Sequence, residues 1–132
     1  MSTTQIRDPI HGTVEFDDVE LSVIDHPLFQ RLRNVKQLGF GDQAFPGATH
    51  SRYAHSLGAA HVAGRVFTAI FGGSNHGVRH GDTNPPAPPH HLDLPRKTAR
   101  KFYRALRLAV LLHDIGHPPL SHSSERGLPQ RK

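Results

Sequence analysis

The sequence predicts a mainly α fold in a single domain, with a short extended segment or hairpin at the N-terminus. Apolar residues recur at helical spacing over two long stretches, residues 52–71 and 98–116. A shorter run, residues 26–39, places Pro27 at its first helical position, where a helix leaves the N–H unbonded in any case. At 132 residues the chain is long enough to bury one modest core.

The N-terminal part of the chain favours an extended segment or hairpin followed by a short helix. In residues 6–16, Gly12 offers a turn, and apolar side chains then alternate with polar ones as far as Phe16. Asp17 and Glu20 stand three residues apart, which is the spacing of a capping box. This pair predicts a helix over residues 18–24.

Residues 26–39 predict a second helix. Leu28, Leu32 and Val35 recur at helical spacing, and Gly39 is placed to end the helix as its C-cap. The opposite face is basic, with Arg31, Arg33 and Lys36. Such a row is usually a solvated face, and contact with phosphate is the alternative. Residues 40–51, which contain glycines and a proline, predict a loop.

Two adjoining apolar stripes run along residues 52–71. One consists of Tyr53, Leu57, Ala60, Gly64, Phe67 and Phe71, and the other of His55, Ala59, Val62 and Val66. A helix that is apolar on two adjoining sides lies between neighbours, so His55 is predicted to point inward. An inward histidine is more often a hydrogen-bonded core residue than a metal ligand, and the spacing alone does not choose between the two.

Residues 71–97 are rich in glycine, proline and histidine, a composition that predicts an exposed, disordered loop. Four histidines lie in it, His76, His80, His90 and His91. Histidine-rich tracts can bind metal adventitiously. We do not place the functional site in this loop.

The last helix is predicted to begin with Thr98 as its N-cap. Its inward stripe is Ala99, Phe102, Leu106, Ala109 and His113, with Tyr103, Val110 and Asp114 beside it. Gly116 ends the helix, and the two prolines that follow prevent its continuation. This spacing brings His113 and Asp114 toward the core at the end of the helix.

Composition restricts the partners and the chemistry. The formal net charge of +5 favours anionic partners, namely nucleic acid, nucleotide phosphates or a membrane surface, although it can also reflect solubility alone. The chain has no cysteine and 12 histidines, so a metal site must use imidazole and carboxylate ligands. There is no signal-peptide pattern at the N-terminus and no apolar run of about 20 residues, so we expect a cytoplasmic protein without a membrane partner.

A metal ion would explain why a histidine and an aspartate stand together at the end of an apolar helix. A buried carboxylate at Asp114 is costly unless a cation or strong donors compensate it, and the C-terminal end of a helix adds an unfavourable dipole. An exposed Asp114 is the simpler alternative. A metal shared by His55, His113 and Asp114 would offset both costs and leave positions open for water. Arg52, three residues before His55, would lie beside it and suits a phosphate oxygen.

Together these stretches resemble the HD-domain metal-dependent phosphohydrolase superfamily, most closely its deoxynucleoside triphosphate triphosphohydrolase (dNTPase) branch. The residues that carry the resemblance are 6–12 (IRDPIHG), 29–33 (FQRLR), 36–39 (KQLG), 45–58 (FPGATHSRYAHSLG) and 112–117 (LHDIGH), followed by His122. The resemblance implies a helical HD-domain fold, present as an N-terminal part. Residues 1–125 would form the partial domain, and residues 126–132 a basic tail.

The resemblance also implies an activity and roles for individual residues. The activity is hydrolysis of a dNTP to a deoxynucleoside and triphosphate with a divalent metal ion, which could be Fe, Mn, Zn, Ni or Mg. The implied metal ligands are His55, His113 and Asp114; the implied catalytic residues are His117 and His122. Arg52, Gln37 and Leu38 match substrate-binding positions, and Asp25, Gln30 and Arg33 match positions that take a regulatory nucleotide in some members. Full-length members are expected to form homo-oligomers.

The family pattern has a fourth metal ligand, an aspartate downstream of the His-Asp pair, whereas Asp114 is the last aspartate of this chain. Two interpretations follow. The chain is either the N-terminal part of an HD-type dNTPase or a truncated, inactive remnant that at most binds nucleotide, nucleic acid or a partner subunit. Loss of a carboxylate ligand favours the second, whereas the intact His55, His113, Asp114 and Arg52 favour the first.

Overall fold

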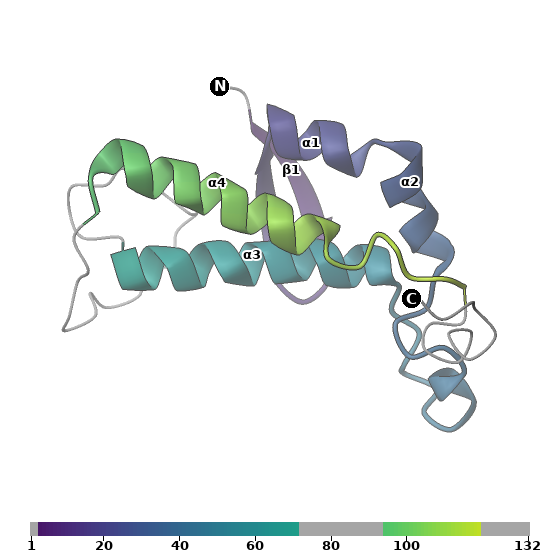
Figure 1. The fold of residues 1–132 in the computed structure, drawn as a ribbon. Coiled ribbons are helices and arrows are strands. Elements are labelled where there is room, and N and C mark those ends of the chain that lie inside the picture. Colours follow the sequence, from purple (N-terminus) through teal and green to yellow (C-terminus); the bar gives the residue numbers. More distant parts are fainter. Residues whose placement is uncertain (1–2, 72–93, 120–132) are drawn as a thin grey trace, which may run out of the picture.

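The computed structural model describes residues 3–71 and 94–119, and within them the fold is mainly α, as predicted. A hairpin of β1 (Thr3–Asp8) and β2 (Gly12–Asp17) leads into α1 (Asp18–Ile24) and α2 (Pro27–Gln30). Two 3-10 turns follow, η1 (Arg31–Asn34) and η2 (Gly41–Gln43). The two long helices are α3 (Arg52–Phe71) and α4 (Arg96–Leu112). They run antiparallel, side by side, with the hairpin, α1 and α2 on one side of the pair (Figure 1).

The hairpin is stabilised by a glycine that permits its turn and by a carboxylate that binds the backbone of that turn. β1 and β2 pair antiparallel, with Thr3 opposite Asp17 and Asp8 opposite Gly12. Gly12 has a φ of 74°, which glycine adopts without strain, and the buried Asp8 carboxylate accepts the backbone N–H groups of Ile10 and His11. The structure therefore confirms the extended N-terminal hairpin.

The capping box also forms as predicted and fixes the start of α1. Asp17 Oδ1 accepts the backbone N–H groups of Val19 and Glu20, each at 3.0 Å. Glu20 Oε2 accepts the backbone N–H of Asp17 at 3.0 Å. Donors that the first helical turn would leave unbonded are thus paired within three residues of the cap.

The single helix predicted for residues 26–39 is wrong in its second half. After α2 and η1, Val35 is extended, and its carbonyl accepts the backbone N–H of Arg52 at 2.8 Å. Lys36 forms an isolated β-bridge with Ser51. Backbone pairing with the segment before α3 therefore replaces the helical hydrogen bonds. Gly39, with a φ of 56°, lies in a turn and does not cap a helix.

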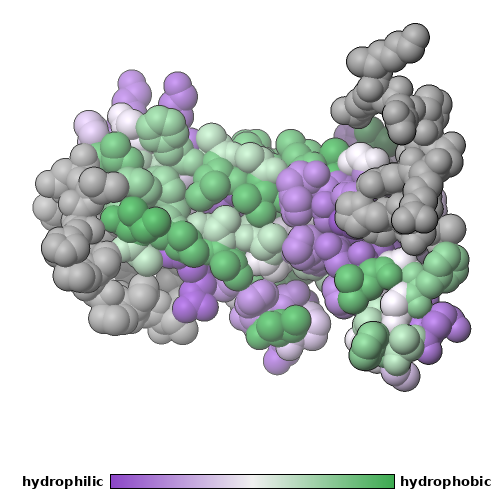
Figure 2. All heavy atoms as spheres, turned by 60° about the horizontal axis from the view of Figure 1, so that its bottom comes forward, coloured by the Kyte–Doolittle hydropathy of each residue, from purple (hydrophilic) through white to green (hydrophobic). Residues whose placement is uncertain are grey.

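The core lies where the hairpin, α1, α2, η1 and the two long helices meet. Its buried members are Val14, Phe16, Ile24, Phe29, Leu32, Tyr53, Leu57, Ala60 and Leu111. The first stripe predicted for residues 52–71 supplies the α3 contribution, so that prediction is confirmed. The second stripe is wrong as a buried face, because Val62 and Val66 are exposed. Figure 2 shows that apolar side chains are exposed over part of one face of the molecule.

The predicted buried face of the last helix is only partly right: Ala99 and Asp114 are buried and Val110 packs against the core, but the two large apolar residues of the inward stripe are exposed. α4 begins at Arg96 with Pro95 at the N-cap, not with Thr98. Phe102 is 55% exposed and Leu106 is 36% exposed, whereas Arg107 is 1% exposed. The helix is rotated from the prediction because an arginine, and not the two large apolar residues, occupies the buried side.

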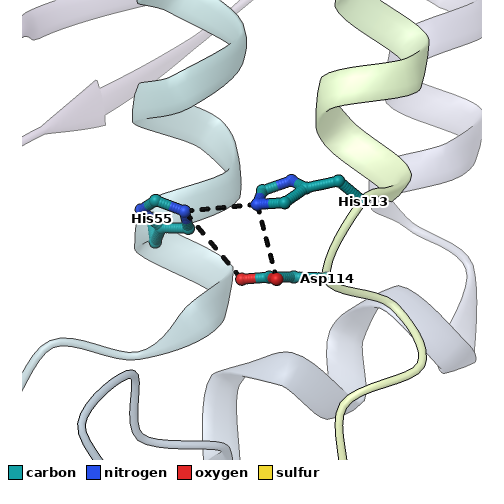
Figure 3. A group of neighbouring side chains, drawn as sticks. All are labelled: His55, His113 and Asp114. Atoms are coloured by element: carbon teal, nitrogen blue, oxygen red, sulfur yellow. Dashed lines mark hydrogen bonds and ion pairs between the residues drawn. The ribbon is translucent and has the colours of Figure 1, made fainter.

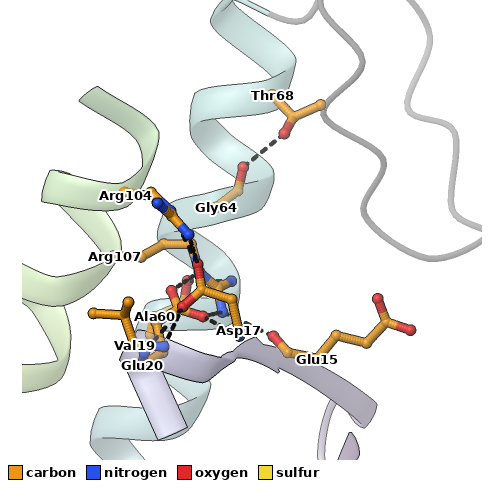
Figure 4. A network of polar contacts seen from close by, with 9 residues as sticks. All are labelled: Glu15, Asp17, Val19, Glu20, Ala60, Gly64, Thr68, Arg104 and Arg107. Carbon is orange, nitrogen blue, oxygen red and sulfur yellow. Dashed lines mark hydrogen bonds and ion pairs between the residues drawn. The ribbon is translucent and has the colours of Figure 1, made fainter. Parts of the chain in front are cut away.

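Arg107 is buried because four acceptors on three other elements surround it (Figure 4). Its guanidinium donates to both carboxylate oxygens of Glu20, at 2.5 and 3.0 Å, and to the carbonyl of Glu15 at 2.9 Å. Its Nη1 lies 3.4 Å from the carbonyl of Ala60. One turn earlier, Arg104 donates twice to Asp17 Oδ2. These bonds connect α4 to β2, α1 and α3.

Of the loop predicted for residues 71–97, residues 72–93 lie outside the part that the structure describes. Phe71 still belongs to α3 and Arg96 to α4, so the long helices extend slightly into the predicted loop at both ends. Among residues 3–71 and 94–119, no helix has the length and apolar character required to span a membrane.

Candidate metal centre

Three potential metal ligands converge where α3 begins and α4 ends (Figure 3). His55 lies in the first turn of α3, and His113 and Asp114 follow the last residue of α4. The Nε2 atoms of His55 and His113 are 3.3 Å apart. Asp114 Oδ1 lies 3.4 Å from His113 Nε2, and Asp114 Oδ2 lies 3.9 Å from His55 Nε2. The structure thus brings together the three residues that the sequence predicted to share a metal.

His113 is oriented by its own helix. Its Nδ1 lies 2.6 Å from the carbonyl oxygen of Val110, and because a carbonyl can only accept, Nδ1 carries the hydrogen. The other ring nitrogen, Nε2, faces His55 and Asp114. Metal-binding histidines are commonly held in this way through their second nitrogen. The His113 side chain is 42% exposed, so the prediction that it faces the core is wrong: it lies at the open edge of the group.

His55 is half-buried, and its environment favours the neutral ring. Burial lowers its pKa below the ordinary value of 6.5, and the nearby His113, Arg52 and His50 lower it further, although Asp114 opposes the shift. A neutral imidazole offers a lone pair, which is the form that binds a metal. The inward direction predicted for His55 therefore holds only in part.

Asp114 is buried, as predicted, and Arg52 compensates its charge. Arg52 Nη1 donates to Asp114 Oδ2 at 2.7 Å, and both side chains are nearly inaccessible. The protein therefore supplies a cation for this carboxylate, so burial of Asp114 does not by itself require a metal. The arrangement of the ligand atoms is the stronger argument.

The ligand atoms fit a small divalent cation. Two imidazole nitrogens bound tetrahedrally at about 2.0–2.1 Å from a metal lie roughly 3.3–3.4 Å from each other. His55 Nε2 and His113 Nε2 have this separation, and the potential ligand atoms of all three residues lie within 4.8 Å of one another. Two neutral imidazoles and one carboxylate match the ligand set of Zn, Fe, Mn or Ni sites.

His117 lies beside the group but is not part of it. Its Nε2 is 3.4 Å from Asp114 Oδ1, and its ring is largely buried. His117 follows Gly116 in the turn after α4, where its N–H donates to the carbonyl of Asp114 at 3.1 Å. The other histidine predicted to be catalytic, His122, lies outside the described residues.

The other residues predicted to bind nucleotide lie between the end of α1 and the segment that follows η1. Gln37 is half-buried and donates its backbone N–H to the carbonyl of His50, whereas Leu38 is exposed. Arg33 donates to Gln30 Oε1 at 2.6 Å and stacks 3.7 Å from the ring centroid of Tyr53. Asp25 is exposed at the C-cap of α1.

Arg31 is a residue of the site that the sequence prediction missed. The sequence places it in a basic row typical of a solvated face, but its guanidinium donates to the carbonyls of Ile115 and His117 in the turn that follows α4. Nothing in the spacing of residues 26–39 distinguishes it from its neighbours. Arg31 is distinguished only by its contacts with Ile115 and His117, which lie 84 and 86 positions further along the chain.

Comparison with known proteins identifies the family. No family model matches the chain. It is 39% identical over 117 residues to the deoxynucleoside triphosphate triphosphohydrolase SAMHD1 of Bos taurus, a match that covers 89% of this chain and 17% of that protein. The chain is homologous to a segment of the HD-domain dNTPases. It spans about a fifth or less of the length of the curated relatives that it matches.

Two other proteins that are similar to this chain are named without a function. An uncharacterised protein of Methanocaldococcus jannaschii is 36% identical over 120 residues, which covers 91% of this chain and 20% of that protein. The crystal structure of a hypothetical protein from Aquifex aeolicus matches with a TM-score of 0.69 at 34% identity, covering 97% of this chain and 27% of that one. The arrangement of elements is thus shared with a longer protein.

Proposed function

We propose that this chain carries the metal-binding part of an HD-domain dNTPase, which hydrolyses a dNTP to a deoxynucleoside and triphosphate. The observation that supports this best is the pair of imidazole Nε2 atoms, 3.3 Å apart and next to the Asp114 carboxylate. Homology to SAMHD1, which is named as a dNTP triphosphohydrolase, supports the substrate class. The helical arrangement around α3 and α4 is proposed to be the HD-domain fold.

The residues of the site are proposed to serve in metal binding, in orientation of a ligand and in proton transfer. His55, His113 and Asp114 would hold a divalent metal ion, which when bound supplies a Lewis acid for the attack on phosphorus. Arg52 fixes the orientation of Asp114 through their 2.7 Å bond and keeps positive charge next to the position of a phosphate. His117, beside Asp114, is suited to donate a proton to a leaving oxygen.

The remaining roles are carried over from the family resemblance. Gln37 and Leu38 are proposed to contact the deoxynucleoside, and His122 to assist His117. Asp25, Gln30 and Arg33 are proposed to take a regulatory nucleotide; Arg33 donates a hydrogen bond to Gln30. We also propose that the protein forms a homo-oligomer and is located in the cytoplasm.

Metal content and triphosphate release test this function together. The purified chain should contain about one equivalent of divalent metal and release inorganic triphosphate from dNTPs. His113→Ala with Asp114→Ala should abolish both. His26→Asn is the matched control, because it removes an exposed imidazole and keeps a side chain that can cap α2.

Two results would oppose the proposal in different ways. Wild-type protein without metal and without triphosphate release would rule out the enzyme. Binding of dNTP without release would favour the inactive remnant that binds nucleotide only. Nucleic-acid binding would instead show an affinity that falls steeply with salt.

A further inference from the structure

We propose that Arg31 is the positioning residue of this site, and that it acts by holding the turn after α4 so that His117 stays next to Asp114. The inference deepens the proposed function and rests on it for the role of His117. Arg31 Nη2 donates to the carbonyl of Ile115 at 2.6 Å, and Nη1 donates to the carbonyl of His117 at 2.9 Å. One planar guanidinium thus binds two carbonyls on either side of Gly116.

Two backbone hydrogen bonds close the turn, from Ile115 N–H to the Leu112 carbonyl and from His117 N–H to the Asp114 carbonyl. A helix leaves its last carbonyls without intrahelical donors, and Arg31 supplies donors to two carbonyls of this turn. A Cβ added at Gly116 would meet nothing within 4 Å, so the side of the backbone where it would stand is open. The two bonds from Arg31 fix the peptide carbonyls before and after Gly116. They therefore set the direction in which the His117 side chain leaves the backbone.

Arg31 can do this because its own element is anchored. Leu32, the next residue, is 0% exposed in the core, and η1 packs against α3. Gln30, the preceding residue, donates to the carbonyl of Ile24 at 2.7 Å. The guanidinium also adds a positive charge at the C-terminal end of α4, where the helix dipole favours a cation.

The result is an aspartate oriented from two sides. Arg52 binds Asp114 Oδ2, and the turn held by Arg31 places His117 Nε2 3.4 Å from Asp114 Oδ1. Since the three proposed metal ligands precede Ile115, loss of Arg31 should affect His117 more than metal binding. Arginine is required because lysine has no planar fork to bind two carbonyls together.

The test compares Arg31→Met and Arg31→Lys with the control Arg100→Met, which removes an exposed arginine of α4. For Arg31→Met we expect kcat for dNTP hydrolysis to fall about 10- to 100-fold, the usual effect of losing a partner that orients a site residue. KM and metal content should stay near wild type. Arg31→Lys should restore little. In a His117→Ala background, Arg31→Met should lower kcat less than about twofold further, because residues that act as a unit are not additive.

Amide hydrogen exchange tests the same inference without activity. The N–H groups of Ile115 and His117 should exchange at least about tenfold faster in Arg31→Met, because local opening becomes easier, and should be unchanged in Arg100→Met. If wild type releases no triphosphate, the proposed function fails and the exchange result still decides the role of Arg31. Unchanged exchange, an equal loss of kcat in both backgrounds, or loss of metal from Arg31→Met would overturn the inference.

Discussion

The two oxygens of Asp114 have different neighbours, and this difference organises the site. Oδ2 accepts a hydrogen bond from Arg52 at 2.7 Å and lies 3.9 Å from His55. Oδ1 lies 3.4 Å from each of His113 and His117. One carboxylate therefore connects α3, through Arg52 and His55, to the turn that follows α4.

At this scale we predict that Arg52→Met destabilises the protein by about 3–5 kcal/mol, the usual cost of leaving one member of a buried ion pair without its partner. Both side chains are nearly inaccessible, so water cannot replace the guanidinium. Urea unfolding at pH 7 measures the change. Arg65→Met, at an exposed arginine of the same helix, should change the free energy of unfolding by less than about 0.5 kcal/mol. Equal effects of the two substitutions would contradict the prediction.

The grouping of His55, His113 and Asp114 could be predicted because helical spacing places each residue at a known end of a long helix. The direction of the His113 ring could not, since it depends on a bond to Val110 and on an open edge of the site. The role of Arg31 could not be predicted either, because its acceptors are backbone carbonyls, which no residue pattern reveals.

At the scale of elements, Asp17 serves two structures at once. Its Oδ1 caps α1, and its Oδ2 accepts two bonds from Arg104 of α4. Asp17→Asn should retain the cap and lose the charge, at a cost below about 1 kcal/mol because the pair is partly exposed. Asp17→Ala should cost roughly a further 1 kcal/mol for the lost cap. Urea unfolding that gives the same stability for both variants would show that the cap contributes nothing.

His61 connects α3 to the turn of the hairpin, where its ring lies 5.2 Å from that of His11. Burial lowers the pKa of His61, and His11, Arg65 and Arg107 lower it further, against the effect of Asp8. The unfolded chain then binds a proton at a higher pH than the folded protein does. Stability should consequently decrease as the pH falls through the ordinary value of 6.5 toward the lower folded pKa.

We predict that His61→Phe reduces this loss of stability between about pH 7.5 and 5.5. Thermal unfolding across that range measures it, with His26→Asn as the exposed control. His55, whose pKa is also lowered, should account for part of the dependence that remains. A slope with pH that is identical in wild type and His61→Phe would refute the assignment.

At the scale of the whole molecule, Arg107 connects α4 to three other elements. It lies 1% exposed and bonds to Glu20 of α1, Glu15 of β2 and Ala60 of α3. Arg107→Met should therefore destabilise the protein by about 3–5 kcal/mol, because Glu20 would be left buried without a cation. Arg100→Met, near the exposed start of α4, serves as the control in urea unfolding, and a similar loss there would contradict this role.

The mainly α fold, the hairpin and the two long helices could be predicted from spacing and capping alone. The rotation of α4 could not be predicted in this way. Phe102 and Leu106 form an apolar stripe, which predicts a buried face, and the acceptors that allow Arg107 to be buried instead are seen only in the structure. The helix predicted for residues 26–39 ends early for a related reason. Its second half pairs with a segment about 15 residues away in the chain.

The antiparallel pair of long helices separates the proposed metal ligands in the sequence while it brings them together in space. His55 belongs to the first of these helices, and His113 and Asp114 follow the second. Phe71, at the other end of α3, is 16 residues beyond His55, or roughly 24 Å along the helix axis. A chain break between Phe71 and Arg96 would leave the ligands on two fragments. A bound ion would then act as a cross-link, and the concentration of metal would control how tightly the two halves reassemble.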